Sequence, residues 1–287
     1  MASLIDLRRR IKSVQNIQEI TKAMKTVATA RFKKSQRQVM ESRPFWHNSP
    51  GLAEKVVFWA QMQHHPLLEK RKENKIEGVV ISSDKGLCGS FNSNLLEKSL
   101  SFFQEKKQSS DVNLLILGRK GVNFYQKQSF PLDRVYYDRI EKMTFQDLKQ
   151  ISRYLLDLYI QHKRDAVYVI YNEFKSILSP KITVAPLIPL NPPEKTNQKG
   201  VYPDWDPSVS LFVDSFLPQY IDTQLYHFFS ESLAAEQAAR MMAMENASKN
   251  AEDLISDLTL ELNKIRQASI TKELLEIMTA VEALGSK

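Results

Sequence analysis

Cysteine is almost absent from this chain of 287 residues, because Cys88 is its only one. An internal disulfide is therefore excluded, and a single thiol cannot build a cysteine-based metal site. Long apolar runs are also missing: runs such as Val112–Leu117 and Val184–Leu190 fall far short of the ~20 residues that a membrane-spanning helix needs. The N-terminus lacks the apolar core of a secretory signal. We expect a cytosolic-side chain without a metal ion, a cofactor or a membrane span.

Glycine and proline are missing from the C-terminal region. The 66 residues from Gln219 to Leu284 contain neither, so nothing there breaks a helix, and such a helix spans roughly 100 Å. Acidic residues are scarce at the other end, where the first 43 residues hold eleven Lys or Arg against three Asp or Glu. The segment 219–284 instead holds eleven acidic residues against five basic ones. The sequence thus predicts two helical arms of opposite charge around a glycine-bearing middle.

Apolar residues recur every three or four positions in both arms, which is typical of one face of a helix. We expect the first helix to run to about Arg43 and to be interrupted by Pro44 and Pro50-Gly51, with a helical pattern resuming over Leu52–Gln63. Successive steps of three in its seam predict a locally irregular supercoil. The expected seam residues are Leu4, Leu7, Ile11, Val14, Ile17, Ile20, Met24 and Val27 in the first arm, and Leu254, Leu258, Leu262, Ile265, Leu274, Ile277, Met278 and Val281 in the second.

The middle of the chain follows a different pattern. Short apolar runs of strand length alternate with helical stretches, which indicates a parallel sheet covered by helices. A run with two prolines is typical of an edge strand, and the proline-rich segment after it predicts a linker. The expected strands are Gly78–Ser83, Val112–Gly118, Ala166–Tyr171 and, at the edge, Lys181–Leu190; the expected helices are Asn94–Lys106 and Thr144–His162, and the linker is Asn191–Pro207.

Three features are candidates for chemistry, and each has a plainer alternative. The turn Asp84–Ser90 follows a strand and precedes a helix, where a nucleotide-binding domain holds phosphate. It lacks both glycine fingerprints, however, so a structural or partner-contacting turn is the preferred interpretation. Cys88 is either a small packed side chain or a nucleophile without a local base. The basic first helix fits either a nucleic-acid footprint or a partner surface. The five histidines lack the neighbours of a metal site.

Motifs along nearly the whole chain resemble those of one family, the gamma subunit of F-type ATP synthase. The segments that carry the resemblance are Leu7–Ile11, Ile20–Ala28, Ser83–Gly89 with Asn92, Tyr171–Ser176, Ser232–Met244 with Asn246-Ala247, and Arg266–Glu273. The chain departs from the family pattern at Ala280-Val281, where a Gly-Ala pair is usual, and at Pro180, where glutamine is usual. Neither departure removes a chemical group that the function needs.

The resemblance implies a fold and a mechanism. The expected fold is α/β: a long antiparallel coiled coil of the N- and C-terminal helices, plus a central Rossmann-like domain with a mostly parallel sheet. The corresponding divisions are 1–65, 66–208 with the linker, and 209–287. As a non-catalytic rotary shaft, the chain would turn inside an alpha/beta hexamer and couple proton flow through the membrane rotor to ATP synthesis or hydrolysis on the beta subunits. The alternative is a basic coiled-coil scaffold or nucleic-acid-binding protein, which predicts salt-dependent binding to DNA.

The resemblance also implies partners. They are the alpha, beta and epsilon subunits and the ring of membrane c subunits, with one copy of the chain per complex, no nucleic acid, and a peripheral location on the cytoplasmic face of the bacterial inner membrane. Tyr202 and Trp205 are expected near the membrane rotor, with packing on their own domain as the alternative. The residues expected to contact the beta subunit are Lys22, Met24, Lys25, Lys85, Cys88, Arg266, Gln267 and Thr271.

Overall fold

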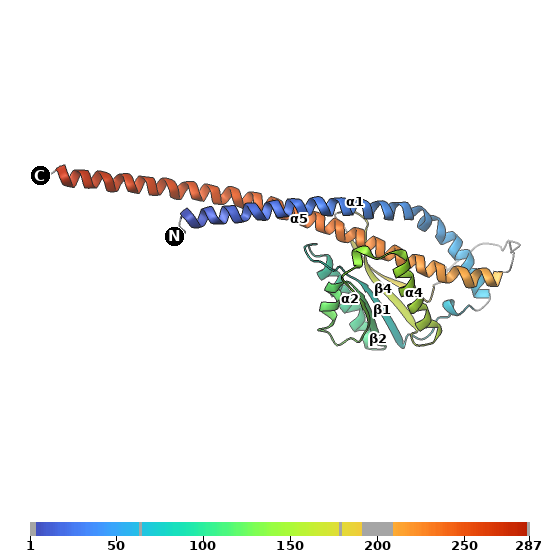
Figure 1. The fold of residues 1–287 in the computed structure, drawn as a ribbon. Coiled ribbons are helices and arrows are strands. Elements are labelled where there is room, and N and C mark those ends of the chain that lie inside the picture. The colour runs from blue at the N-terminus through green and yellow to red at the C-terminus, as the bar shows by residue number, and fades with distance from the viewer. Residues whose placement is uncertain (1–3, 63–64, 178–179, 191–208, 286–287) are drawn as a thin grey trace. The chain divides into compact units, whose positions relative to one another are not determined.

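The computed structural model describes residues 4–62, 65–177, 180–190 and 209–285 (Figure 1). The chain divides into two compact units: Met1–Ala28 with Met241–Lys287, here called the helix pair, and Thr29–Arg240, here called the sheet unit. Two long helices, α1 (Leu4–Met62) and α5 (Val209–Gly285), contribute to both units. The expected linker, with Tyr202 and Trp205, lies outside the described residues, and the expected divisions at residues 65 and 208 stay a prediction.

The sheet unit contains one five-stranded sheet in the order β3-β2-β1-β4-β5. The four strands from β3 to β4 are parallel, and β5 pairs with β4 in the antiparallel direction. The mostly parallel sheet and its proline-bearing edge strand confirm the prediction, whereas β3 was missed because most of its side chains are exposed. The strands are β1 (Lys75–Ile81), β2 (Asp111–Leu117), β3 (Leu132–Tyr136), β4 (Ala166–Glu173) and β5 (Lys181–Ile188).

Helices cover both faces of this sheet. On one face α2 (Phe91–Lys107) and α3 (Arg119–Tyr125) pack against β1 and β2, and on the other α4 (Phe145–Ile160) and the first part of α5 close a second core (Figure 1). Two short 3-10 helices, η1 (Pro66–Leu68) and η2 (Ile140–Lys142), complete the elements. The helix α3 was not predicted, because its seven residues are too few to show a helical period.

Each strand contributes side chains to the two cores alternately, because successive side chains of a strand point to opposite faces of the sheet. In β1, Ile76 and Val80 belong to the core under α2, and Val79 and Ile81 to the core under α4. Between them, Gly78 has a packing role, since a Cβ atom there would lie 2.3 Å from the ring of Phe103 on α2. Glycine at this position lets the aromatic ring rest directly on the strand.

In the helix pair, the buried positions of α1 differ from the predicted seam. They alternate by threes and fours without interruption, which is the regular heptad of a left-handed coiled coil. The irregular supercoil expected from the apolar residues is therefore wrong, because polar side chains occupy the seam while Ile17, Ile20 and Val27 are 51%, 59% and 53% exposed. The buried or half-buried seam positions of α1 are Leu4, Leu7, Ile11, Val14, Gln18, Thr21, Lys25 and Ala28.

The same regular spacing occurs on α5. Leu254 is exposed rather than part of the seam, and the expected extension to the end of the chain is wrong, because every side chain from residue 270 to residue 281 is exposed. Leu274, Ile277, Met278 and Val281 therefore project from the helix instead of packing in it. The seam positions of α5 are Met241, Met244, Ser248, Ala251, Ile255, Leu258, Leu262, Ile265 and Ser269.

The predicted interruption of the first helix is also wrong. The backbone of α1 stays helical through Pro44 and Pro50 up to Met62, and the ribbon bends in this part of the helix (Figure 1). A proline removes one hydrogen bond and pushes against the carbonyl four residues earlier, so it can be accommodated by a bend instead of a break. Likewise, α5 begins at Val209 and continues through Pro218.

Candidate functional site

The turn after β1 places Asp84 at the carboxyl edge of the sheet. One carboxylate oxygen accepts the backbone N–H of Arg119, the first residue of α3, at 3.0 Å, and the other accepts the N–H of Ile140 at 3.0 Å. In a nucleotide-binding domain an anionic phosphate takes up such N–H groups at the start of a helix. Here the side chain of the protein itself fills that position, so the turn is built as a closed structural element.

Hydroxyl and amide groups lock the rest of this turn. Ser82 Oγ donates to the carbonyl of Leu117 at 2.8 Å and accepts the N–H of Gly121 at 2.9 Å. Asn92 Nδ2 donates to Ser83 Oγ at 2.8 Å and lies 3.2 Å from Cys88 Sγ. Burial raises the pKa of the Cys88 thiol, and its side chain is only 2% exposed. A nucleophilic cysteine needs the opposite, a lowered pKa and access, so Cys88 is a packed side chain.

A segment of α5 fills the crevice in which α/β folds of this kind bind ligands. Such crevices lie at the carboxyl ends of the strands where the chain changes direction across the sheet, here between β1 and β4. At the end of β4, the carboxylate of Glu231 accepts the N–H of Phe174 at 2.9 Å, and at the end of β1 the hydroxyl of Ser232 donates to the carbonyl of Ile81 at 3.3 Å. These contacts leave the ligand position of the fold occupied by the chain's own helix.

One turn further along α5, a buried ion pair ties the same helix to the turn. Arg240 Nη2 lies 2.6 Å from Glu236 Oε1 and donates to the carbonyls of Lys85 and Gly86, both at 3.4 Å. Burial outweighs the neighbouring guanidinium and raises the pKa of Glu236 to about 7. Because removing one partner would leave the other charge buried and unpaired, this pair strongly specifies how α5 sits on the turn.

The turn presents two side chains outward. Lys85 is exposed, and Leu87 is 61% exposed with a φ of 61°, a left-handed conformation that a leucine rarely adopts. A backbone held in such a conformation makes Leu87 a candidate for a functional contact. Leu87 was missed by the sequence analysis, although its place inside the noted turn was visible. Cys88, in contrast, offers almost no surface of its own.

Two contacts show the antiparallel register of the helix pair. Lys25 forms an ion pair with Glu245, and Ser248 Oγ donates to Thr21 Oγ1 at 2.8 Å. Counting back along both helices from these contacts brings the start of α1 at Leu4 opposite the Ile265 region of α5. Of the other expected contact residues here, Lys22 is exposed and Met24 half-buried. The antiparallel pairing of the terminal helices is confirmed, although the polar members of its seam were not predicted.

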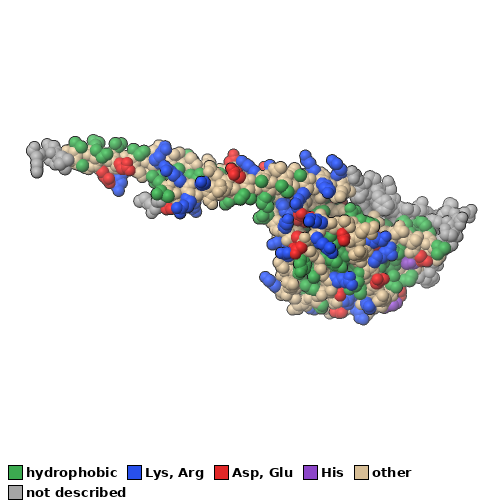
Figure 2. Space-filling view, viewed as in Figure 1, with side chains coloured by type: hydrophobic (Ala, Val, Ile, Leu, Met, Phe, Trp, Pro, Cys, Tyr) green, Lys and Arg blue, Asp and Glu red, His purple; other side chains and the backbone are tan. Residues whose placement is uncertain are grey.

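Beyond that point α5 continues without α1. Arg266, Gln267 and Thr271 are exposed on this extension, and the hydroxyl of Thr271 donates to the carbonyl of Gln267 at 3.0 Å. Hydrophobic side chains lie on the surface of these last turns (Figure 2). The extension therefore offers charged, amide and apolar groups to any protein that surrounds it.

The buried ion pair and the polar seam residues were not predicted, although the sequence contains signals for both. Glu236 and Arg240 stand four residues apart in a segment otherwise rich in alanine, and charged residues among small ones indicate a buried pair. Gln18 and Thr21 continue the three-and-four spacing set by the preceding apolar residues. In the part of the chain that the structure describes, no cluster of His, Cys, Asp and Glu could hold a metal ion. None of the described helices combines the length and apolar character needed to cross a membrane.

The family model described as ATP synthase matches residues 3–284. The chain is 38% identical over 285 residues to the ATP synthase gamma chain of Pelotomaculum thermopropionicum, covering 99% of this chain and all 100% of that protein. It is 34% identical over 290 residues to the gamma chain of Chlorobaculum parvum, covering 99% of each. The chain therefore belongs to the ATP synthase family. Both of these relatives are gamma chains.

Two solved structures have the same fold. A chain of the central stalk and c-ring of Tetrahymena thermophila mitochondrial ATP synthase matches with a TM-score of 0.60 and 26% identity, covering 80% of this chain and 99% of that one. A chain of the rotor of Euglena gracilis mitochondrial ATP synthase matches with a TM-score of 0.66, covering 93% and 98%. At 19% identity the second likeness concerns the fold alone.

Proposed function

We propose that this chain is the rotating central-stalk subunit of an F-type ATP synthase and catalyses no reaction by itself. The observation that carries the proposal is the helix pair: two terminal helices in antiparallel register, one of which continues alone with exposed side chains. Its membership of the gamma-chain family supports the same function. The filled crevice of the sheet unit argues against a nucleotide-dependent enzyme.

The helix pair suits a shaft because it is asymmetric. Its seam joins unlike helices, so each angle of rotation presents different side chains to a surrounding subunit. Six alternating alpha and beta subunits would meet a different face of the shaft at each step. A face that binds one conformation of a beta subunit better than another shifts its population toward that conformation, so rotation imposes a sequence of states on the catalytic sites.

The proposed contacts with the beta subunits are weak and exposed. Lys22 and Met24 on α1 and Lys85 with its turn would meet acidic loops, while Arg266, Gln267 and Thr271 on α5 would hydrogen-bond a loop that catches the rotor. Exposed pairs contribute about 0 to 1 kcal/mol each and are screened by salt, which suits a surface that must slide. The charge of Lys25 is already engaged by Glu245, and Cys88 takes part only as a member of its turn.

The remaining partners follow from the same assembly. The epsilon subunit and the ring of c subunits would turn with the chain, one copy of which serves each complex, and proton flow through the ring would supply the torque. The chain would lie peripherally on the cytoplasmic face of the bacterial inner membrane. Tyr202 and Trp205 stay candidates for contact with the membrane rotor.

Rotation is tested on the assembled complex with its alpha/beta ring fixed to a surface. A bead attached through Lys98→Cys, an exposed position on α2, is expected to turn in one direction when ATP is added. A disulfide across the helix pair in the double variant Thr21→Cys/Ser248→Cys should leave the rate of ATP hydrolysis within about twofold of the rate before oxidation, because both helices would move as one body. The labelling control is the chain with Cys88 as its only cysteine, treated in the same way as the variant. Continued ATP hydrolysis under a stationary bead would contradict the proposal.

A further inference from the structure

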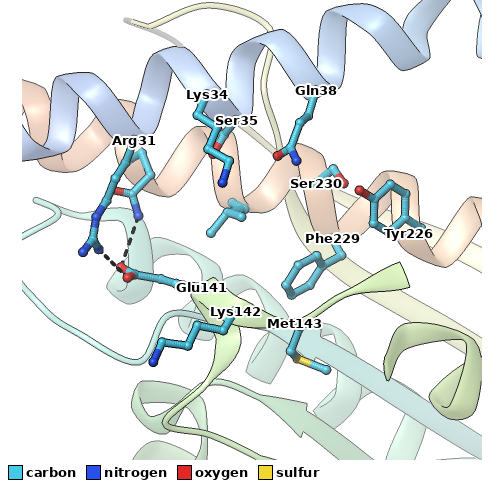
Figure 3. Close-up of a pocket in the computed structure, with 12 residues that line it drawn as sticks. Arg31, Lys34, Ser35, Gln38, Glu141, Lys142, Met143, Tyr226, Phe229 and Ser230 are labelled. Carbon is cyan, nitrogen blue, oxygen red and sulfur yellow. Dashed lines mark hydrogen bonds and ion pairs between the residues drawn. The ribbon is translucent and has the colours of Figure 1, made fainter. Parts of the chain in front are cut away.

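A pocket of about 480 Å³ opens within the sheet unit between α1, η2 and α5 (Figure 3). This volume lies in the range of about 300 to 1,000 Å³ that is usual for ligand pockets. None of the contacts assigned above to the turn or to the helix pair uses it. Its lining residues on α1 are Arg31, Lys34, Ser35 and Gln38, with Glu141–Met143 below and five residues of α5 from Tyr226 to Gln237 behind.

The rim of this pocket is cationic. Arg31 is paired with Glu141, as the dashed line in Figure 3 marks, so this acidic residue of the lining is already engaged. Lys34 and Lys142 are exposed and make no ion pair with any residue of the described ranges. Two exposed lysines in the lining of one pocket, neither paired with an acidic side chain of the described residues, favour an anionic occupant.

The inner wall combines apolar surface with a buried amide. Phe229 and Leu233 of α5 and Met143 provide the apolar part. Gln237 is only 2% exposed, and its Oε1 atom has no hydrogen-bond partner among the described residues, while its Nε2 lies 3.5 Å from Glu141 Oε1. That oxygen is shielded from solvent, so what this wall offers an occupant is the apolar surface of Phe229, Leu233 and Met143.

We propose that this pocket docks an acidic segment of a partner subunit that turns together with the shaft. Acidic side chains of that segment bind Lys34 and Lys142, and a neighbouring apolar side chain packs on Phe229 and Leu233. The inference rests on the proposed function only where it assigns the occupant to the rotor. A concave pocket with an inserted side chain resists sliding, so its occupant belongs to the rotor and not to the ring around it.

The test uses the assembled complex carrying Gln38→Cys labelled with benzophenone maleimide. Gln38 is an exposed lining residue, and native Cys88 is buried and labels slowly. On illumination we expect a cross-link to a partner peptide that contains Asp or Glu, with ATP hydrolysis kept within about twofold because the two linked subunits rotate together. The matched control is Arg37→Cys, one residue away and outside the lining, which should give at least fivefold less of this product.

Charge reversal provides the second measurement. Lys34→Glu and Lys142→Glu should each lower the cross-link yield at least fivefold, whereas Lys33→Glu, an exposed neighbour outside the pocket, should leave it unchanged. A cross-link to an alpha or beta subunit that stops ATP hydrolysis, a peptide without acidic residues, a bound small anion in place of a protein, or no cross-link in an intact complex would each overturn the inference. Because the bead assay reports rotation independently, a rotating complex without the cross-link refutes this docking site alone.

Discussion

In the sheet unit, both faces of the sheet are covered by apolar side chains, and Leu114 and Leu115 have no exposed surface. In the helix pair, the seam includes Gln18 and Thr21, and large apolar side chains lie outside it in solvent. Apolar burial contributes roughly 25 cal/mol per Å², so the two regions are stabilised very differently by the chain's own contacts. The comparison teaches that the sheet unit buries most of its apolar surface within itself, whereas the helix pair leaves large apolar side chains exposed.

The largest effect is expected in the core of the sheet unit. Leu115→Ala should lower the free energy of unfolding of this unit by about 3 kcal/mol, because the lost side chain leaves a cavity under α4. Urea titration of the full chain, with hydrogen exchange followed separately in β1 and β2, measures the change. The exposed Leu260→Ala in the helix pair is the control and should cost less than about 1 kcal/mol. Equal losses would remove the contrast between the two regions.

The second effect is a dependence on pH inside the sheet unit. Glu77 of β1 is fully buried, its Oε2 lies 2.9 Å from Arg164 Nε, and burial raises its pKa from 4.5 to about 7. Because the folded unit binds this proton more tightly than the unfolded chain, stability should fall as the pH rises from about 4.5 to about 7.

Replacement of this carboxyl sharpens the assignment. In Glu77→Gln, the unfolding free energy should decline by about 2 kcal/mol less between pH 4.5 and pH 7 than in the unchanged chain. We assign the remaining decline to Glu236, because burial raises its pKa to a similar value. Urea midpoints at pH 5, 6 and 7 measure it. An identical slope in the variant would show that Glu77 is ionised throughout the window.

The third effect reverses the usual sign of a mutation. Replacing the polar pair in the seam by Thr21→Val with Ser248→Ala should stabilise the helix pair by about 1 kcal/mol, since an apolar seam no longer has to satisfy two buried hydroxyls. Slower hydrogen exchange in residues 4–28, with unchanged exchange in the sheet unit, is the expected readout. Faster exchange would mean that the hydroxyl contact itself holds the register.

The smallest effect concerns the ion pair at the edge of the seam. Lys25→Met should change the stability of the helix pair by less than about 1 kcal/mol. The side chains of Lys25 and Glu245 are 40% and 50% exposed, so solvent and salt screen the attraction between their charges. The same hydrogen-exchange measurement at low and high salt checks this. A loss well above that figure would place Lys25 among the main determinants of the pairing.

Much of the fold could be predicted from periodicity. Runs such as Val79–Ile81 are apolar on both faces of the sheet, and the absence of Gly and Pro between Gln219 and Leu284 left that segment without a stop signal. The seam register was predicted wrongly after Val14, because the apolar neighbours Ile17, Ile20 and Met24 were taken as seam positions in place of Gln18, Thr21 and Lys25. The breaks at Pro44 and Pro50 were wrong because a bend is enough to accommodate proline.

The site was only partly visible in the sequence. The turn around Lys85 was recognised as a contact surface or phosphate loop, yet the choice depends on Asp84 and on Glu231, which lies far away in the sequence. No local spacing reveals that a helix from the other end of the chain fills the crevice. The roles of Arg266, Gln267 and Thr271 are still predictions, because they concern atoms of another protein.

The unaccompanied end of α5 has a consequence for how the chain behaves before and after assembly. A single helical stretch in water gains little from its own hydrogen bonds, and short ones are marginal. Every side chain from residue 270 to residue 281 is exposed, so no tertiary packing within the described chain stabilises the helix there. We therefore expect the helicity of this tip to rise when other proteins surround it, so a measurement of its helicity would report whether the shaft has been assembled.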